Sequence, residues 1–105
     1  MRKIESQMNS AIRGRRDWRS GNTAVVINDS NDALVYLHGN FIAKVSQHFV
    51  QLFDGGWQSN TTKSRLNALL DEFVPSMRIF QNDWTWYISD SLDGSKRLFT
   101  SGMTV

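Results

Sequence analysis

The sequence predicts an α+β fold in which two helices cover one face of an antiparallel sheet. Two segments repeat apolar residues every three or four positions, which is the spacing of an amphipathic helix. The other segments are short runs of β-branched and aromatic residues separated by turn-forming residues, which is typical of strands. Strands and helices do not alternate regularly, so no parallel sheet is predicted. The 105 residues are the length of a single domain.

The first helix is predicted from residue 2 to about residue 16. Its apolar stripe comprises Met1, Ile4, Met8, Ala11 and Ile12, and the opposite side carries Arg2, Ser6, Asn9 and Arg13. Gly14 weakens the last turn, where the carbonyl end of the helix dipole favours nearby cations. The turn-forming residues 20–22 then break the chain.

Four consecutive strands are predicted at residues 24–27, 34–37, 41–45 and 49–53. Residues 28–32 and 38–40 are rich in Asn, Asp and Gly, which favour tight turns between strands. A further Asp-Gly-Gly sequence at residues 54–56 ends the last strand. Short connections join neighbouring strands in antiparallel fashion, so we expect a four-stranded meander.

A second helix is predicted at residues 62–74, capped by Thr61 or Asn60 and ended by Pro75. Two or three further strands follow, at residues 77–80, 84–88 and 96–100, and the pattern leaves open whether they join the main sheet. The residues expected to be buried are Trp57, Leu66, Leu69, Leu70 and Phe73. Those expected to be exposed are Arg13, Arg16 and Ser64.

Composition excludes several classes of protein. The chain has no cysteine, which excludes disulfides, thiolate metal sites and a cysteine nucleophile. The N-terminal residues lack the apolar core of a signal peptide, and no apolar run is long enough to span a membrane. We therefore expect a soluble cytoplasmic protein that does not bind membranes.

No catalytic or metal-binding motif is present. The two histidines, His38 and His48, lie in a turn and at a strand start, outside any motif for nucleophilic catalysis. The acidic pair Asp71 and Glu72 diverges by about 100° on a helix, so it does not converge on one cleft. No metal-ligand spacing or phosphate-binding glycine loop occurs. We therefore expect no enzymatic activity, no metal and no cofactor.

Basic residues are concentrated at the N-terminal end. Residues 1–19 hold six basic and two acidic side chains, a net charge of +4, and the rest of the chain has a net charge of −2. The candidate nucleic-acid-binding residues here are Arg13, Arg15, Arg16, Trp18 and Arg19. Guanidinium groups pair with phosphates and an aromatic ring can stack on a base. The alternative is a helix whose terminal cations satisfy its dipole while Trp18 packs on the core.

The start of the second helix is another candidate site, at Thr62, Lys63 and Arg65. A helix N-terminus offers amides and hydroxyls to an anion, and the two cations add charge. The alternative is an ordinary exposed first turn. A duplex backbone cannot be followed from opposite faces, so this hypothesis requires a continuous surface comprising Arg13, Arg16, Arg19, Lys63 and Arg65.

Three aromatic and apolar residues near the C-terminus, Trp84, Trp86 and Ile88, share one face of a predicted strand. Such a face is either core or a stacking platform for bases. Core is the preferred interpretation because strand residues at alternating positions commonly pack inward.

Several segments resemble a family of small tailed-bacteriophage proteins of unknown function. They read MRKIE at residues 1–5, WRSGNT at 18–23, LHGN at 37–40 followed by Ile42 and Ala43, and GWQSNTTKSRLN at 56–67. The resemblance covers most of the chain and implies a phage origin and a place in the cytoplasm of the infected bacterium. It assigns no catalytic or binding residue.

Two functional hypotheses follow. The first is a non-enzymatic phage accessory protein that binds nucleic acid through the two basic sites. The second is a phage protein that binds a host protein, such as a polymerase or a defence enzyme, and inhibits or redirects it. The clustered N-terminal charge favours the first hypothesis, whereas the low net charge of +2 favours the second. The sequence does not predict an oligomeric state.

Overall fold

The computed structural model describes residues 2–105 and confirms the predicted α+β class. Met1, which was predicted on the apolar stripe of the first helix, lies outside the described residues. The elements follow the order α1 (Lys3–Arg13), β1 (Trp18–Ser20), β2 (Thr23–Ile27), β3 (Ala33–Leu37), β4 (Asn40–Val45), β5 (Val50–Leu52), α2 (Asn60–Phe73), β6 (Met77–Asn82), β7 (Thr85–Asp90), β8 (Ser95–Leu98) and β9 (Met103–Thr104).

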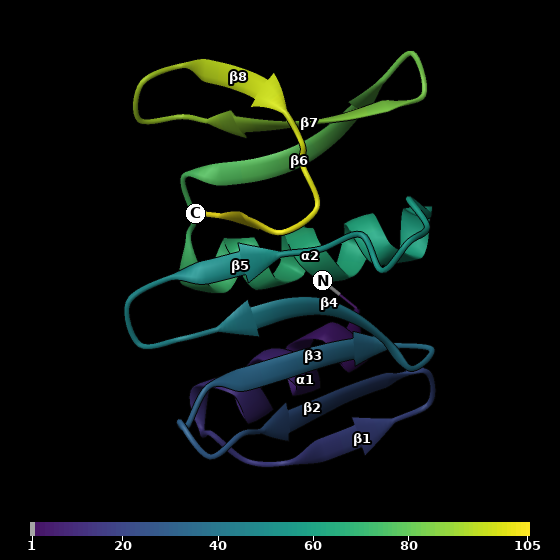
Figure 1. Cartoon of the computed structure of the whole chain (residues 1–105), viewed down its shortest axis with the longest axis vertical. Helices are drawn as coiled ribbons and strands as arrows, with labels where there is room; N and C mark the ends of the chain where they lie inside the picture. Colours follow the sequence, from purple (N-terminus) through teal and green to yellow (C-terminus); the bar gives the residue numbers. More distant parts are fainter. Residues whose placement is uncertain (1) are drawn as a thin grey trace.

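The strands form two antiparallel sheets (Figure 1). The larger sheet has six strands in the order β1-β2-β3-β4-β5-β9, and the smaller sheet has three in the order β6-β7-β8. The predicted meander is β2 to β5. Strands β1 and β9 extend it at its two edges and were not predicted, because three and two residues are too few to show a period. The C-terminal strands β6 to β8 form a sheet of their own.

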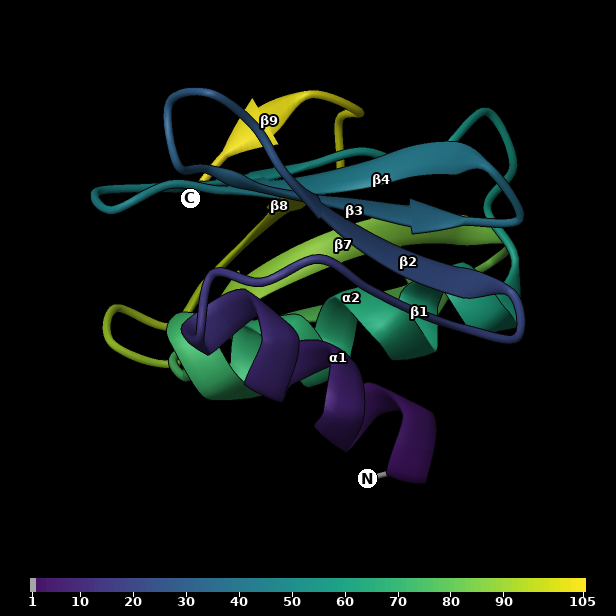
Figure 2. The ribbon, with the colours of Figure 1, turned by 90° about the horizontal axis from the view of Figure 1, so that it is seen from below.

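Both helices lie on the same face of the six-stranded sheet (Figure 2). Helix α1 buries Met8, Ala11 and Ile12, as its apolar stripe predicts, and it ends at Arg13, with Gly14 as its C-cap, rather than near residue 16. Asn9 was predicted on the solvent side but is buried, because α2 packs along that flank and its Ala68 carbonyl accepts a hydrogen bond of 3.0 Å from the Asn9 amide. The helix contact is therefore wider than the apolar stripe.

Helix α2 begins two residues earlier than predicted. Its N-cap is Ser59, not Thr61 or Asn60: the Ser59 hydroxyl accepts a 3.1 Å hydrogen bond from the Thr62 amide. The predicted stripe is buried at Leu66, Leu69 and Leu70, whereas Phe73 in the last turn is half-buried. The helix ends before Pro75, as predicted.

The small sheet is attached to α2 and to the C-terminal segment. The side-chain amide of Asn67 exchanges two hydrogen bonds with the backbone of Ile79, at 2.9 and 2.7 Å. The Phe99 ring meets the Trp86 ring edge-on at 5.4 Å, and Figure 1 shows the chain after β8 crossing over β6 and β7 toward β9. One face of the small sheet, with Ile79, Trp86 and Ile88, is therefore core.

Two tryptophans are exposed against prediction. Trp57 is 75% exposed in the loop between β5 and α2, and Trp84 is 90% exposed. Asp83 and Trp84 form the two-residue turn between β6 and β7, and both have positive φ angles of 49° and 65°. Trp84 is therefore outside the strand and does not share a face with Trp86, so the predicted core face holds only for Trp86 and Ile88. No helix within residues 2–105 is long and apolar enough to cross a membrane.

Candidate nucleic-acid interface

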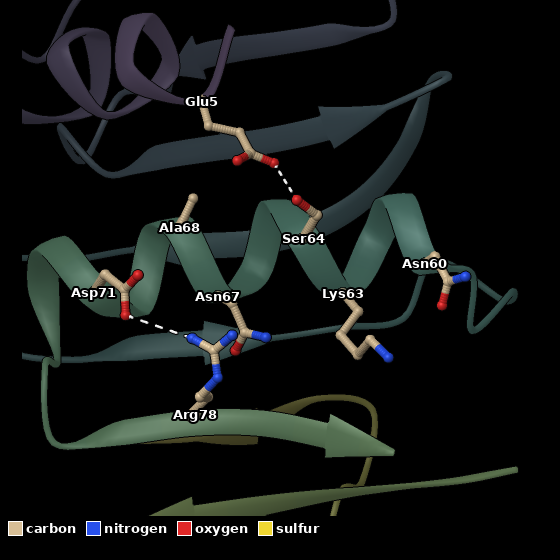
Figure 3. A pocket seen from close by; sticks show the side chains of 8 residues that line it. All are labelled: Glu5, Asn60, Lys63, Ser64, Asn67, Ala68, Asp71 and Arg78. Carbon is tan, nitrogen blue, oxygen red and sulfur yellow. Dashed lines mark hydrogen bonds and ion pairs between the residues drawn. The ribbon is translucent and has the colours of Figure 1, made fainter. Parts of the chain in front are cut away.

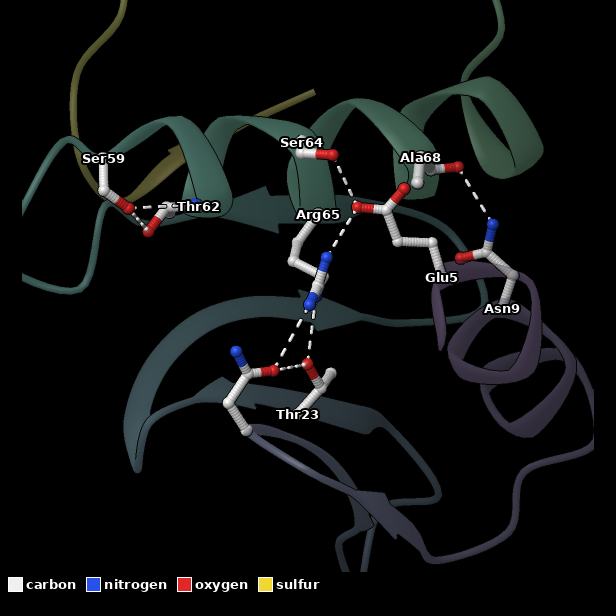
Figure 4. Close-up of polar contacts among 9 residues, drawn as sticks. Glu5, Asn9, Thr23, Ser59, Thr62, Ser64, Arg65 and Ala68 are labelled. Atoms are coloured by element: carbon white, nitrogen blue, oxygen red, sulfur yellow. Dashed lines mark hydrogen bonds and ion pairs between the residues drawn. The ribbon is translucent and has the colours of Figure 1, made fainter. Parts of the chain in front are cut away.

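Arg65 is part of a buried polar network that joins both helices to the large sheet (Figure 4). Its guanidinium pairs with the Glu5 carboxylate at 2.8 Å, and both side chains are 4% exposed. It also donates to the Thr23 hydroxyl at 3.0 Å and to the Asn22 side-chain oxygen at 3.2 Å, while Ser64 donates to Glu5 at 2.6 Å. The predicted role of Arg65 as a phosphate contact is wrong, because its donors are used inside the protein.

The rest of the predicted site at the start of α2 is only partly available. Thr62 is buried, and its hydroxyl lies 3.0 Å from the hydroxyl of Ser59. The amides of Thr62 and Lys63 both donate to Ser59, one to its side chain and one to its carbonyl. Only the Lys63 side chain remains at the surface, with its Nζ 3.4 Å from the Oε1 of Gln81.

The cations that follow α1 bind the end of their own helix. Arg15 donates to the Ile12 carbonyl at 2.7 Å. Arg16 donates to the carbonyl and the hydroxyl of Ser10 at 3.4 and 3.2 Å. Both carbonyls also accept backbone amides, so the two guanidiniums add second hydrogen bonds and positive charge at the negative end of the helix dipole. The geometry therefore favours the alternative interpretation of this cluster as a helix terminus.

The remaining predicted residues point in different directions. Arg13 is exposed and forms an ion pair with Glu72 of α2. Trp18 is half-buried against the core, as the alternative interpretation predicts. Arg19 pairs with Ala24 in the sheet register, on the face opposite to that of the helices, whereas Lys63 lies on the helix side. The predicted continuous basic surface is therefore wrong.

A pocket of about 480 Å³ lies on the helix side, between α1, α2 and β6 (Figure 3). Its lining residues are Glu5, Asn60, Lys63, Ser64, Asn67, Ala68, Asp71 and Arg78. Figure 3 shows Arg78 reaching from β6 toward Asp71, at 4.0 Å, and Lys63 extending from α2 on the same side. The pocket therefore brings together two cations from separate elements.

The outward face of the small sheet continues from this pocket. Strand register places Phe80, Tyr87 and Leu98 directly side by side across β6, β7 and β8. The Phe80 and Tyr87 rings stack at 5.5 Å with 21° between their planes, and Leu98 is 57% exposed. None of the three belongs to the hydrophobic core or packs against it. We call these three residues the aromatic row.

A second row lies two residues along each strand on the same face. It comprises Arg78, Ser89 and Lys96, which the register also aligns, and we call it the basic row. Same-face residues two apart on a strand are separated by about 6.6 Å, so cations lie close beside rings. Arg78 belongs to both the pocket and the basic row, so pocket and face form one surface. We call the two rows together the aromatic–basic face.

The aromatic–basic face was missed in the sequence. A signal was present, since Arg78 and Phe80 alternate with the buried Ile79, and Tyr87 alternates with Trp86 and Ile88. The predicted face comprised only Trp84, Trp86 and Ile88, and the last two lie on the buried side of this alternation.

The turn between β7 and β8 holds a carboxylate with a lowered pKa. The hydroxyl and the amide of Ser95 donate hydrogen bonds to Asp93, and the amide bond is 2.8 Å long. These bonds stabilise the charged form and hold the pKa of Asp93 below its ordinary value. An ionised carboxylate therefore orders the turn from which β8 starts at neutral pH.

The fold and this face define a small α+β protein with an exposed surface of rings and cations. The family model of the Kyanoviridae Gp96 protein matches residues 1–105, so the chain belongs to this family of tailed cyanophage proteins. The match confirms the resemblance to a phage family. No curated protein and no solved structure shows significant similarity to the chain.

Proposed function

We propose that the chain is a non-enzymatic phage accessory protein that binds single-stranded nucleic acid in the cytoplasm of the infected host. The observation that carries the proposal is the aromatic row beside the basic row on an exposed sheet face. The site differs from the one predicted from sequence, of which it keeps only Lys63, in the adjoining pocket.

The aromatic row supplies stacking surface. Phe80 and Tyr87 are half-buried at their strands and their rings stack on one another, so together they form an aromatic pair that a base can extend by stacking on an outer ring face. Each base of an unpaired strand has a π-face, and stacking on an aromatic side chain is worth about 1–3 kcal/mol per base. Leu98 extends the apolar surface onto the edge strand β8.

The basic row supplies phosphate contacts. The Lys96 side chain has no hydrogen bond or ion pair with any residue in the described chain. Arg78 pairs with Asp71 at 4.0 Å, with both side chains more than half exposed, and such surface pairs contribute about 1 kcal/mol or less. A phosphate can therefore replace Asp71 at Arg78 with little loss.

The geometry favours a single strand over a duplex. In a duplex the bases stack on one another and cannot lie on the Phe80 and Tyr87 rings. A duplex is held mainly by cations that follow its backbone, and Arg19 lies on the opposite face while Arg65 is buried. A short surface with rings beside cations fits a flexible strand of a few nucleotides.

The proposal is tested by the anisotropy of a labelled 12-nucleotide oligo-dT, with oligo-U and a 12-base-pair duplex as comparisons. We expect Tyr87→Ala to weaken oligo-dT binding roughly five- to 150-fold, because it removes one stacking surface. The duplex should bind more weakly than either single strand.

The matched control is Tyr36→Ala, which removes a half-buried tyrosine from the outward face of the large sheet. It should leave oligo-dT affinity unchanged, and thermal melts of both variants check that they fold. Equal losses in the two variants, or no binding by the wild type at low salt, would show that the aromatic–basic face is not a nucleic-acid site.

A further inference from the structure

The face of the large sheet opposite to the helices carries mostly apolar side chains. Strand alternation and register place there Arg19, Ala24, Val26, Leu34, Tyr36, Phe41, Lys44, Gln51, Phe53 and Thr104, which we call the open face. In Figure 2 the helices lie below the sheet, and the open face is the upper side. An antiparallel sheet with one solvated face normally alternates apolar residues inward with polar residues outward. Here the outward side of β2 and β3 is apolar as well, whereas the polar residues of the open face lie on the strands toward the edges of the sheet.

Aromatic contacts run across the open face. The Tyr36 and Phe41 rings lie 5.6 Å apart, and the Phe41 and Phe53 rings lie 4.6 Å apart. None of the three packs against the hydrophobic core, and Val26 is 42% exposed. These rings therefore do not stabilise the interior, and a contiguous apolar patch of this kind marks an interaction surface.

The charges on the open face argue against nucleic acid. Lys44 is held by Asp32 at 3.6 Å and lies over the Phe49 ring at 5.9 Å. The Arg19 guanidinium is the one cationic group of this face without a hydrogen bond or ion pair to any of residues 2–105. A single free cation gives one phosphate contact, which is too few for an affinity that depends on backbone neutralisation.

A groove of about 440 Å³ lies at one end of the open face, beside Arg19. The outward side chains Ala24, Val26 and Tyr36 line it, and the turns around Gly21 and at residues 38–39 close its end. The groove therefore places these three side chains beside the unpaired Arg19 guanidinium, and the rest of its lining includes the polar residues Asn22, Thr23 and His38. Interface hot spots combine these features: an apolar anchor fills a pocket and a charged pair is shielded next to it.

We propose that the open face binds a different protein, one that presents an apolar surface with a carboxylate that pairs with Arg19. A second copy of this chain is a poor fit, because both carboxylates beside this face are engaged within the chain: Asp17 accepts a hydrogen bond from the Ile27 amide at 2.8 Å, and Asp32 pairs with Lys44. Two copies face to face would leave both Arg19 guanidiniums without a partner. This inference is independent of nucleic-acid binding at the aromatic–basic face.

The experiment places the photo-crosslinking residue p-benzoylphenylalanine at Leu34, on the open face, and in a matched chain at Leu92. Leu92 is 84% exposed in the turn between β7 and β8. The tagged chains are expressed in host cells during infection, irradiated and treated with nuclease. We expect one nuclease-resistant protein adduct from position 34 and none from position 92.

Dependence on Arg19 decides whether such an adduct is the proposed partner. With the purified partner, Arg19→Glu should weaken binding at least tenfold, Arg19→Gln should weaken it less, and a carboxylate-to-lysine change in the partner should restore binding to the Arg19→Glu chain. Melting curves should be unchanged, since Arg19 is exposed and unpaired.

Four results overturn the proposal. They are no adduct at position 34, an adduct of twice the 12.0 kDa chain, an adduct lost on nuclease treatment, and an adduct insensitive to Arg19→Glu. The second result identifies a homodimer and the third identifies nucleic acid as the occupant. The fourth shows that capture at position 34 does not depend on the groove.

Discussion

The outward faces of the two sheets both carry aromatic rings, but the residues beside those rings differ. On the small sheet, the ring of Tyr87 lies beside the basic row with Lys96. On the large sheet, the ring of Tyr36 lies on the same face as Val26 and Leu34, and the only free cation is at the edge strand. Stacking surface alone therefore does not select a partner. The neighbouring row does, because cations recruit phosphates whereas aliphatic side chains recruit protein surfaces.

The two faces belong to one folded framework, and a change to either face tests binding only if this framework stays folded. That framework depends on the Glu5–Arg65 network, which links α1, α2 and the start of β2. It is buried, whereas the residues of both faces are at least partly exposed. Changes to the framework should therefore affect stability, and changes to either face should affect binding.

The largest effect is expected from Arg65→Met. This change leaves the Glu5 carboxylate buried without its counter-charge, and breaking a buried ion pair in this way costs about 3–5 kcal/mol. The free energy of unfolding, measured by urea denaturation, should fall by that amount. Arg13→Ala, which breaks the surface pair with Glu72, should lower it by about 1 kcal/mol or less.

A second variant separates lost charge from lost packing. Combining Glu5→Gln with Arg65→Met removes the stranded charge, so stability should recover partly. If the single and double variants are equally unstable, the loss is due to packing and the ion pair is not the framework contact we infer.

A smaller effect is expected from removing the basic row. The double variant Arg78→Ala/Lys96→Ala should flatten the log–log salt dependence of oligo-dT binding by about 1.4, since each single-strand phosphate contact contributes about 0.7. The wild type should then lose about sevenfold more affinity than the variant between 50 and 200 mM salt. The control Arg15→Ala/Arg16→Ala should keep the wild-type slope, because those side chains bind their own helix end. Identical slopes for the Arg78/Lys96 variant and the wild type would remove the basic row from the site.

The smallest effect is expected at the tip of the small sheet. Trp84 is a bulky residue at φ 65° in a two-residue turn, a conformation that suits glycine or asparagine. Trp84→Gly should raise the free energy of unfolding by up to about 1 kcal/mol, seen as a melting temperature a few degrees higher. If the exposed ring also contacts bases, oligo-dT affinity falls at the same time.

Asn31→Gly is the control, because Asn31 has the same φ of 65° in the turn between β2 and β3 of the large sheet. It should raise stability only slightly, since asparagine tolerates this conformation, and it should not change oligo-dT binding. A stability gain at Trp84 without any loss of affinity would mean that the ring is not used in binding.

Much of the fold was predictable because it depends on local periodicity. The leucine residues of α2 recur every three or four positions, and turn-forming residues separate the strands from β2 to β5. Both patterns are visible in the sequence itself. Strands β1 and β9 were not predictable, since they exist only by pairing with longer strands at the sheet edges. Trp84 was misplaced because a turn conformation overrides the usual burial of tryptophan.

The candidate site was predictable only in small part. Lys63 and Arg65 are about 200° apart on a helix, so one faces solvent while the other faces inward. The local sequence pattern does not show that the inward-facing Arg65 forms an ion pair with Glu5, which lies far away in the sequence. The aromatic and basic rows depend on which residues pair across three strands, and pairing register is a property of the folded sheet.

The ion pair between Glu5 and Arg65 also sets an order of events during synthesis. Its partners are 60 residues apart in the chain, so the carboxylate of the first helix leaves the ribosome long before its arginine. At about 5–20 residues per second, that interval is roughly 3–12 seconds. During it the newly made meander has no second helix to cover it, and its apolar inner face is open to chaperones or to a neighbouring nascent chain. The ion pair that fixes α1 against the rest of the fold therefore forms only after α2 has been translated.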